Sequence, residues 1–304
     1  MTLSARARIG VTLGDPRGIG PEIVRKALAD PRVRALAATW LVIGPSGTEQ
    51  LVNDAVGKWT PTGVRASDAA RAGGLAGLSV TRAANLAMAG DIDGMVTAPI
   101  DKAALLAGGF DFPGHTEMLG AIAGCPTTMM LASERLRVVL ATTHIALRDV
   151  PSALTHEAIV RAATATRDGL THGFGIAVPR IALCALNPHG GDDGRFGDED
   201  ARLLAPAARA AGIAGPFPAD TVFVRALRGE FDAVIAPYHD VGMTAIKVAS
   251  FGQAVNVTLG LPFVRTSPDH GTAHDIAGQG IASAESMIAA LQLAVSLISR
   301  RRDA

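Results

Sequence analysis

A chain of 304 residues with 48% hydrophobic and 18% charged residues can bury a sizeable core, which excludes a disordered protein. Lysine plus arginine and aspartate plus glutamate number 28 each, so the charge balance gives no argument for binding nucleic acid or an anionic membrane. Cys125 and Cys184 form no metal or redox motif and are expected to be buried thiols in a reducing compartment. Without an apolar run of signal-peptide or membrane-span length, the pattern predicts a cytoplasmic protein.

Strands and helices are predicted to alternate in the first third of the chain. A β-rich run at Arg8–Leu13 leads into a Gly/Pro loop at 14–22. That loop lacks both the Gly-x-Gly-x-x-Gly and the Gly-Lys-Ser/Thr pattern, so it is a weak nucleotide signature. The elements expected next are a helix over Pro21–Leu28, a strand at Trp40–Gly44, a helix over Ser46–Val56, a loop over 57–75, a helix over Leu75–Ala89 and a strand at Asp93–Thr97.

The same alternation continues to the C-terminus. The expected elements are paired strands at 127–131 and 137–143, a helix over Glu157–Asp168, a strand at Arg180–Leu186, a helix over Ala201–Ala210, a strand at Ala233–Pro237 and a last helix over Ala284–Arg300. Regular alternation of this kind predicts an α/β fold with a mainly parallel sheet.

Three histidines each follow a predicted strand: His144, His189 and His239. The carboxyl ends of parallel strands meet at one edge of a sheet, where ligands collect. Neutral imidazoles are common ligands of zinc and related divalent ions. We therefore expect a divalent-metal site at this edge, although no two of the three form a local ligand pair in sequence.

Residues that suit an anionic ligand lie before and after these histidines in the sequence. Between Tyr238 and Gly280, in a stretch too rich in Gly and Pro for one helix, lie Lys247, Asn256 and Arg265. Two cations and an amide suit an anionic small molecule. His115 and Thr116 begin a predicted helix and offer either an anion site or a plain helix cap. Lys102, in the first turn of another helix, is equally consistent with a site-facing or a solvated lysine.

The motifs GDPRGIGPEI, TAPIDK, PGHTE, TTHIALRDVP, ALNPHGG, PADT, YHD and VNVTLGLPFVRTSPDHGTA occur in this order between Gly14 and Gly280. In this combination the chain resembles the 4-hydroxythreonine-4-phosphate dehydrogenase family of pyridoxal phosphate biosynthesis. The resemblance implies an isocitrate/isopropylmalate dehydrogenase-like fold, with mainly parallel sheets in two domains and a cleft between them. The expected domains are 1–115 with 265–304, on the cofactor side, and 116–264, which carries the metal ligands and dimer contacts.

The resemblance also implies a reaction and a site. NAD or NADP oxidises the 3-hydroxyl of 4-phosphooxy-L-threonine, and the resulting keto acid loses carbon dioxide to give 3-amino-2-oxopropyl phosphate. Matching motif positions imply metal ligands at His144, His189 and His239, and substrate contacts at His115, Thr116, Lys247, Asn256 and Arg265. The family also implies a homodimer with shared metal ligands.

The cofactor and the acid–base chemistry are less closely defined. The loop HGTAHDIAGQG (270–280) resembles the family's nicotinamide-cofactor loop, which implies contacts from His270, Gly271, Thr272, Ala273 and Asp275. The expected metal is zinc, cobalt or magnesium, because imidazoles and substrate oxygens together suit all three. Asp240 is either a catalytic base or, as we prefer, a residue that orients His239.

The sequence departs from the family pattern at Val241, at Asp101 and in the GGDDGRFG run after His189. These departures leave two alternatives open. One is a family member that acts on another four-carbon acid phosphate, such as threonate or erythronate 4-phosphate, or on a dihydrodiol dicarboxylate. The other is a metal-dependent lyase or a phosphosugar-binding protein without redox chemistry.

Overall fold

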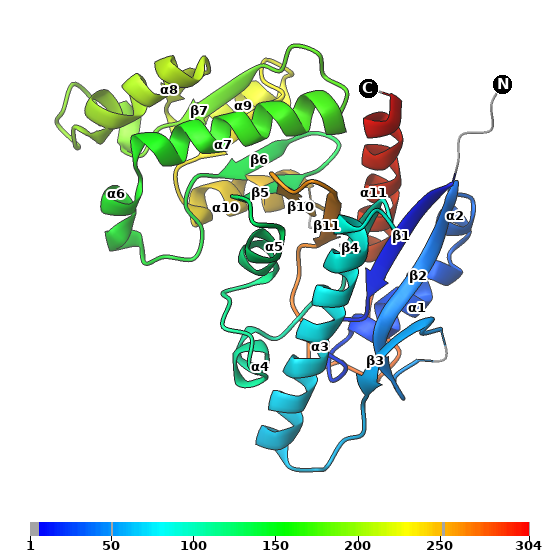
Figure 1. Cartoon of the computed structure of the whole chain (residues 1–304). Coiled ribbons are helices and arrows are strands. Elements are labelled where there is room, and N and C mark those ends of the chain that lie inside the picture. The colour runs from blue at the N-terminus through cyan, green and yellow to red at the C-terminus, as the bar shows by residue number, and fades with distance from the viewer. Residues whose placement is uncertain (1–5, 50, 251–252, 304) are drawn as a thin grey trace. The chain divides into compact units, whose positions relative to one another are not determined.

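The computed structural model describes residues 6–49, 51–250 and 253–303 (Figure 1). The chain forms two compact units, Met1–Thr127 with Leu261–Asp303, and Thr128–Gly260. The first unit is therefore built from both ends of the chain, as the sequence predicts for its first domain. The predicted domain limits themselves stay a prediction, because compactness alone does not show that a unit folds independently.

The first unit contains a parallel sheet with strand order β3-β2-β1-β4-β11. Buried β-branched and apolar residues such as Ile9 and Val11 supply its core. The strands are β1 (Ala7–Thr12), β2 (Ala38–Ser46), β3 (Asp54–Lys58), β4 (Gly94–Thr97) and β11 (Val264–Pro268). The helices are α1 (Gly20–Ala29), α2 (Pro31–Arg34), α3 (Arg65–Met88), α4 (Lys102–Ala107), α5 (His115–Ala123) and α11 (Glu285–Asp303).

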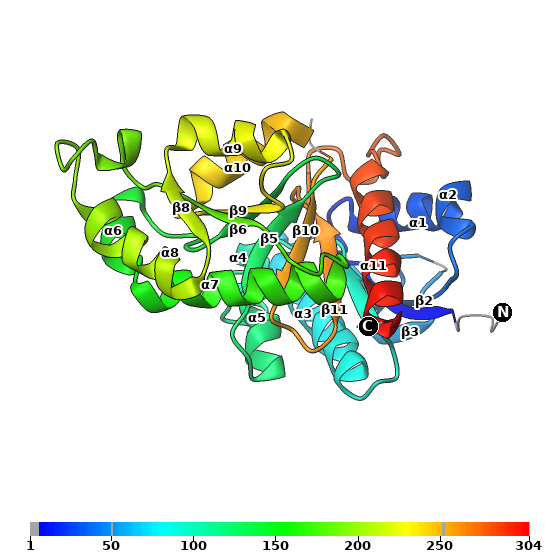
Figure 2. The ribbon, with the colours of Figure 1, turned by 90° about the horizontal axis from the view of Figure 1, so that it is seen from above.

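The second unit contains strands in the order β10-β5-β6-β9-β7-β8, of which β10-β5 and β5-β6 are antiparallel pairs and the remaining pairs are parallel. Figure 2 shows α9 and α10 on one side of these strands and α7 and α8 on the other. The strands are β5 (Thr128–Ala132), β6 (Arg137–Leu140), β7 (Ile181–Cys184), β8 (Ala214–Phe217), β9 (Ala233–Ala236) and β10 (Val255–Leu259). The α-helices are α6 (Val150–Ala153), α7 (His156–Asp168), α8 (Ala205–Ala211), α9 (Ala219–Leu227) and α10 (His239–Ser250).

The predicted α/β class with a mainly parallel sheet is confirmed. Two local predictions are wrong. The described residues of 46–56 do not form a helix: Asn53 exchanges hydrogen bonds with the backbone of Val42 in β2, and the chain then continues as the edge strand β3. A side chain that hydrogen-bonds to the backbone of a neighbouring strand stabilises this turn relative to a helix.

The second error concerns the Gly/Ala-rich segment 57–75, predicted as a loop. Helix α3 already begins at Arg65 and continues for 24 residues. Its glycines allow close packing against α4, since a Cβ on Gly73 would lie 1.8 Å from the carbonyl oxygen of Ala104. Helix α3 then packs along β1, β2 and β4 through Val80, Ala83 and other small residues.

The thiol and membrane predictions have simple outcomes. Cys184 is buried, and burial raises the pKa of its thiol to about 12, whereas Cys125 is only half-buried. Within the part of the chain that the structure describes, no helix has both the length and the apolar content needed to cross a bilayer.

The contact of α3 with α4 gives a test of the packing. We expect Gly73→Ala to lower the free energy of unfolding by about 1–3 kcal/mol, because the added methyl group has no space at the helix contact. Gly74→Ala is the matched control: its Cβ would meet its nearest neighbour at 3.4 Å, so improved helix propensity should leave stability unchanged or higher. Urea denaturation measures both, and equal effects would contradict the close contact.

Candidate functional site

Two of the predicted metal ligands come together at one edge of the second unit. Strands β6 and β9 are parallel neighbours, and His144 and His239 follow their carboxyl ends. The loop after β6 is tied to β9 by two hydrogen bonds: the Thr142 hydroxyl donates to the Pro237 carbonyl at 2.7 Å and Ala141 N–H to the Ala236 carbonyl at 2.9 Å. As a result, the two imidazole ring centroids are 5.5 Å apart.

The local chemistry leaves a ring nitrogen available on His239. Nδ1 of His239 lies 2.6 Å from Oδ1 of Asp240, so this nitrogen carries the proton that the carboxylate accepts. Nε2 is then the lone-pair atom, which is the state of a metal-ligating histidine with a carboxylate partner. The two imidazoles, Asp240 and the half-buried Tyr238 line a small hollow of about 120 Å³.

His189 follows β7, the next parallel neighbour of β9, but it is held differently. Its backbone is left-handed, with φ 54°, and its exposed ring lies 6.5 Å from the ring of Phe196. The three imidazoles therefore end up after three adjacent parallel strands. They do not, however, form a compact three-ligand cluster among the described residues of this single chain.

A buried carboxylate shapes the loop that carries His189. Asp200, 2% exposed, accepts hydrogen bonds from the backbone N–H groups of Leu186 and Asn187 at 2.8 and 2.9 Å. In the sequence, Asp200 directly precedes the predicted helix over Ala201–Ala210. Nothing in that local pattern indicates that Asp200 reaches back 14 residues, because this pairing depends on the fold.

The first unit holds a buried cation next to a buried imidazole nitrogen. Arg265, on β11, is 1% exposed and donates from Nη2 to the Thr97 hydroxyl at 2.6 Å. Burial lowers the pKa of its guanidinium to about 9, against the opposing charge of Glu117. Such a desolvated cation favours an anionic ligand.

His115 begins α5, as predicted, and its Nε2 is buried with no hydrogen-bond partner among the described residues. Burial holds its pKa well below the ordinary value, and the positive charges of Arg265 and Lys102 lower it further. The imidazole is therefore neutral at pH 7. Lys102 is solvent-exposed, yet it is close enough to affect this group.

The other proposed substrate contacts lie on well-defined elements. Asn256 is on β10 opposite Leu131, and its buried Oδ1 has no hydrogen-bond partner in the described part of the chain. Lys247 is exposed in the last turn of α10, so His239 and Lys247 share a helix that the sequence did not predict. Thr116 is half-buried in α5, and its carbonyl accepts a hydrogen bond from the Thr127 hydroxyl at 3.1 Å.

The predicted cofactor loop follows β11 and lies against the loop after β1. The carbonyl of Thr272 accepts a hydrogen bond from Ile19 N–H at 2.9 Å, and Ala273 has a left-handed φ of 42°. His270 and Thr272 are half-buried, whereas Gly271 and Asp275 are exposed. A hollow of about 310 Å³ lies beside this loop, lined by residues that include Arg17, Glu22, Glu49, Trp59 and Gly278.

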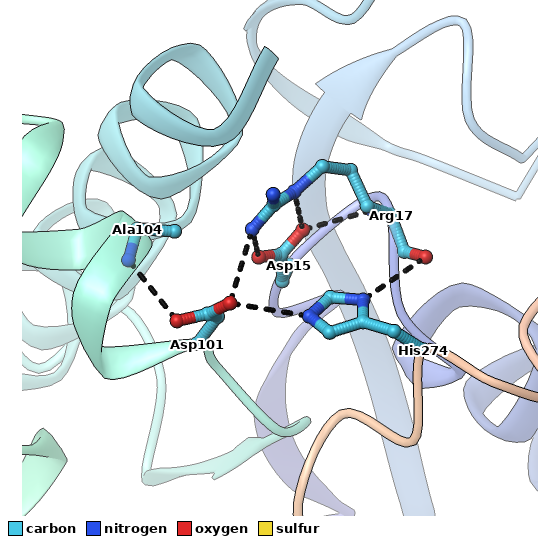
Figure 3. A network of polar contacts seen from close by, with 5 residues as sticks. All are labelled: Asp15, Arg17, Asp101, Ala104 and His274. Atoms are coloured by element: carbon cyan, nitrogen blue, oxygen red, sulfur yellow. Dashed lines mark hydrogen bonds and ion pairs between the residues drawn. The ribbon is translucent and has the colours of Figure 1, made fainter. Parts of the chain in front are cut away.

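Figure 3 shows a polar network at the loop that the sequence did not predict. Both oxygens of the fully buried Asp15 accept hydrogen bonds from Arg17, whose Nη2 also contacts Asp101 at 3.3 Å. His274 lies 3.2 Å from the same Asp101 carboxylate. The only sequence signal was the GDPRG motif, whose Asp and Arg stand two residues apart.

Comparisons with known proteins identify the family of the chain. Residues 46–294 match the family model for pyridoxal phosphate biosynthetic protein PdxA. The chain is 45% identical to a 4-hydroxythreonine-4-phosphate dehydrogenase of Paracoccus denitrificans, over 96% of this chain and 98% of that protein. A crystal structure of 4-hydroxythreonine-4-phosphate dehydrogenase from Klebsiella pneumoniae is similar with a TM-score of 0.83 and 37% identity, covering 98% of this chain and 99% of that one.

A more distant comparison bears on the fold alone. Isocitrate dehydrogenase from Methylococcus capsulatus matches with a TM-score of 0.55 and 15% identity, over 97% of this chain and 87% of that one. The predicted isocitrate dehydrogenase-like fold is thereby confirmed.

The buried imidazole of His115 predicts a pH effect on stability. In the unfolded chain a histidine takes up a proton near pH 6.5, whereas folded His115 resists protonation because its pKa is lowered. Stability should therefore fall as pH drops below about 6.5, by at most about 1.4 kcal/mol per pH unit from this group. Urea denaturation of wild type and His115→Gln at pH 7.0 and 5.5 isolates the contribution of His115, and an identical pH dependence would contradict it.

Proposed function

Because the chain belongs to the PdxA family of pyridoxal phosphate biosynthetic proteins, we propose that it is a 4-hydroxythreonine-4-phosphate dehydrogenase. It oxidises 4-phosphooxy-L-threonine with a nicotinamide cofactor, and the product keto acid decarboxylates to 3-amino-2-oxopropyl phosphate. The observation that carries the proposal is 45% identity over nearly the full length of both chains to a protein of that name. Family and fold together imply a nicotinamide cofactor and a metal.

The substrate carries two anionic groups, a phosphate and a carboxylate, and the proposed contacts match it. Arg265 offers a desolvated, bidentate fork, and Lys247 adds a flexible ammonium. The neutral His115 donates or accepts a hydrogen bond without adding charge, and Thr116 and Asn256 contribute a hydroxyl and an amide. Nε2 of His115 and Oδ1 of Asn256 are buried without a hydrogen-bond partner among the described residues. Buried polar atoms are normally hydrogen-bonded, so a substrate that supplies these partners supports this role.

The imidazoles His144 and His239 fit a divalent metal, with His189 as the third ligand from this chain or a partner. The bound ion supplies Lewis-acid stabilisation of negative charge on the substrate oxygens. Asp240 holds the His239 ring in the tautomer that presents Nε2, which supports an orienting role over that of a catalytic base. Zinc, cobalt and magnesium are the candidate ions.

The proposed cofactor contacts are His270, Gly271, Thr272, Ala273 and Asp275, with NAD or NADP as the ligand. The hollow beside residues 277–278 supports a dinucleotide there, since Arg17, Trp59 and Gly278 are among the residues that line it. A homodimer is part of the proposal. The exposed apolar side chains of Ile145 and Leu147, 43% and 68% exposed beside His144, support a subunit contact near the metal ligands.

Two alternatives use the same residues: one changes the substrate, and the other has no redox chemistry. A family member acting on threonate or erythronate 4-phosphate would retain the anion-binding cations, whereas a dihydrodiol dicarboxylate dehydrogenase has no phosphate to bind. A metal-dependent lyase or phosphosugar-binding protein would leave the hollow beside the 270–280 loop without a cofactor to bind.

The first test is reduction of NAD or NADP by 4-phosphooxy-L-threonine. We expect metal-dependent turnover that a chelator removes and that His239→Ala lowers by about 100-fold or more, because a ligand is lost. The control is His172→Ala, which changes an exposed histidine outside the site. Formation of the reduced cofactor, followed by absorbance, measures all three proteins.

The outcomes separate the alternatives. Turnover only with threonate or erythronate 4-phosphate, or with a dihydrodiol, would retain the reaction class and change the substrate. Absence of turnover with every substrate, together with absence of cofactor binding, would rule out the dehydrogenase proposal.

A second test concerns the buried guanidinium. Arg265→Met should lower kcat/KM for the phosphorylated substrate about 30- to 100-fold, since a charge-assisted contact in a desolvated site is lost. Arg34→Met, at an exposed arginine, is the control. Steady-state kinetics and a thermal melt together distinguish lost binding from lost folding, and an unchanged kcat/KM would remove Arg265 from the substrate site.

A further inference from the structure

The 270–282 segment is attached to its own unit near its start, in its middle and at its end, where Lys26 Nζ also donates to the carbonyls of Gly280 and Ala282 at 2.9 and 2.7 Å. Its start is tied by the Ile19–Thr272 backbone hydrogen bond of 2.9 Å. Its end is tied by the buried carboxylate of Glu22, which accepts hydrogen bonds from Gly280 N–H at 3.3 Å and Ala282 N–H at 3.0 Å. The middle of the segment is held by one side chain, His274.

Both ring nitrogens of His274 face acceptor atoms. Nε2 lies 3.2 Å from Oδ2 of Asp101, and Nδ1 lies 3.5 Å from the carbonyl oxygen of Arg17. The loop after β11 is thus connected to the loop after β4 through Asp101 and to the loop after β1 through Arg17 (Figure 3). One side chain therefore connects the loops that follow three neighbouring parallel strands.

Asp101 is itself rigidly placed. It is the N-cap of α4, where Oδ1 accepts a hydrogen bond from Ala104 N–H at 3.1 Å, and this leaves Oδ2 for His274. Partial burial raises the pKa of this carboxyl, but the hydrogen bonds from Ala104 and His274 outweigh that effect and the net pKa is lowered. The acceptor is therefore a fixed, ionised carboxylate.

The group Asp15, Asp101 and His274 has the composition of a metal site, with ligand atoms within 4.8 Å of one another. A cation already occupies it. The guanidinium of Arg17 donates to both oxygens of Asp15, at 3.0 and 2.6 Å, and to Asp101 at 3.3 Å. Because one guanidinium bridges the two carboxylates, we interpret the cluster as a clamp between loops rather than as a metal centre.

We propose that Asp101 and His274 are positioning residues that latch the 270–280 loop in the conformation that binds the dinucleotide. The proposal rests on the proposed function for the identity of the ligand. His274 does not line the hollow beside the loop, so it acts through the backbone of the loop, whose residues 277 and 278 do line it. A partly exposed hydrogen bond of this kind shifts the loop equilibrium by about fivefold.

The decisive variant is His274→Leu, which keeps the approximate size of the side chain and removes both ring nitrogens. We expect faster amide hydrogen exchange in peptides covering 270–280 of the cofactor-free protein. We also expect about fivefold weaker NADH binding, a KM for NAD raised by a similar factor and a kcat within about twofold of wild type. His274→Gln restores a donor near the Nε2 position and should recover most of the affinity, which a purely structural role would not require.

Two further variants distinguish the His274–Asp101 contact from a change in α4 and from the general effect of replacing an exposed histidine by leucine. Asp101→Asn preserves the N-cap of α4 but removes the charge, so it should weaken NADH binding without loosening α4. His172→Leu makes the same substitution at an exposed histidine in the 169–173 turn and should change neither exchange at 270–280 nor NADH affinity.

The outcomes distinguish this inference from the proposed function. Unchanged hydrogen exchange at 270–280 in His274→Leu would overturn the latch whatever the activity of the enzyme. Faster exchange with unchanged NADH affinity would overturn the link between the latch and the dinucleotide. A wild-type protein that binds neither NADH nor NADPH and reduces neither NAD nor NADP would instead contradict the proposed function, and the exchange data would still decide whether the latch exists.

Discussion

Parallel pairing of neighbouring strands is the constraint on which both sets of functional residues depend. Parallel strands place their carboxyl ends, and the loops that follow, at one edge. In the second unit β6, β9 and β7 bring His144, His239 and His189 to such an edge. In the first unit the neighbouring strands β1, β4 and β11 do the same for the loops that carry Arg17, Asp101 and His274. One geometric rule therefore organises both the proposed metal site and the proposed cofactor loop.

Buried charges then give these loops their shape. A buried carboxylate is tolerated only with hydrogen-bond donors around it, so each one determines the path of nearby backbone. Asp15 fixes the turn through Arg17, Glu22 holds the end of the 270–282 segment, and Asp200 folds the loop of His189. Arg265 differs because its pKa is lowered to about 9 by burial. In the proposed function, an anionic substrate compensates the burial of this cation.

Glycine has two separate roles in this fold, and they explain why the prediction of a loop over residues 57–75 is wrong. In α3, Gly73 permits contact with α4, so a glycine-rich segment is helical because of its packing. After β1, Gly14 has φ 70°, and a Cβ there would lie 2.2 Å from the Pro99 carbonyl, so the loops after β1 and β4 can approach closely. Local sequence does not distinguish these uses, because the neighbouring element decides between them.

The sequence alone determined the α/β class, the strand-end positions of the three histidines and the family motifs, since each depends on local periodicity or on an ordered set of short motifs. It also placed His115 at a helix start and Arg265 among the anion-binding candidates. Only the tertiary structure decided that His144 and His239 lie with ring centroids 5.5 Å apart and that Asp101 meets His274. These pairs are 95 and 173 residues apart in the chain, and strand order, which local patterns do not encode, brings them together.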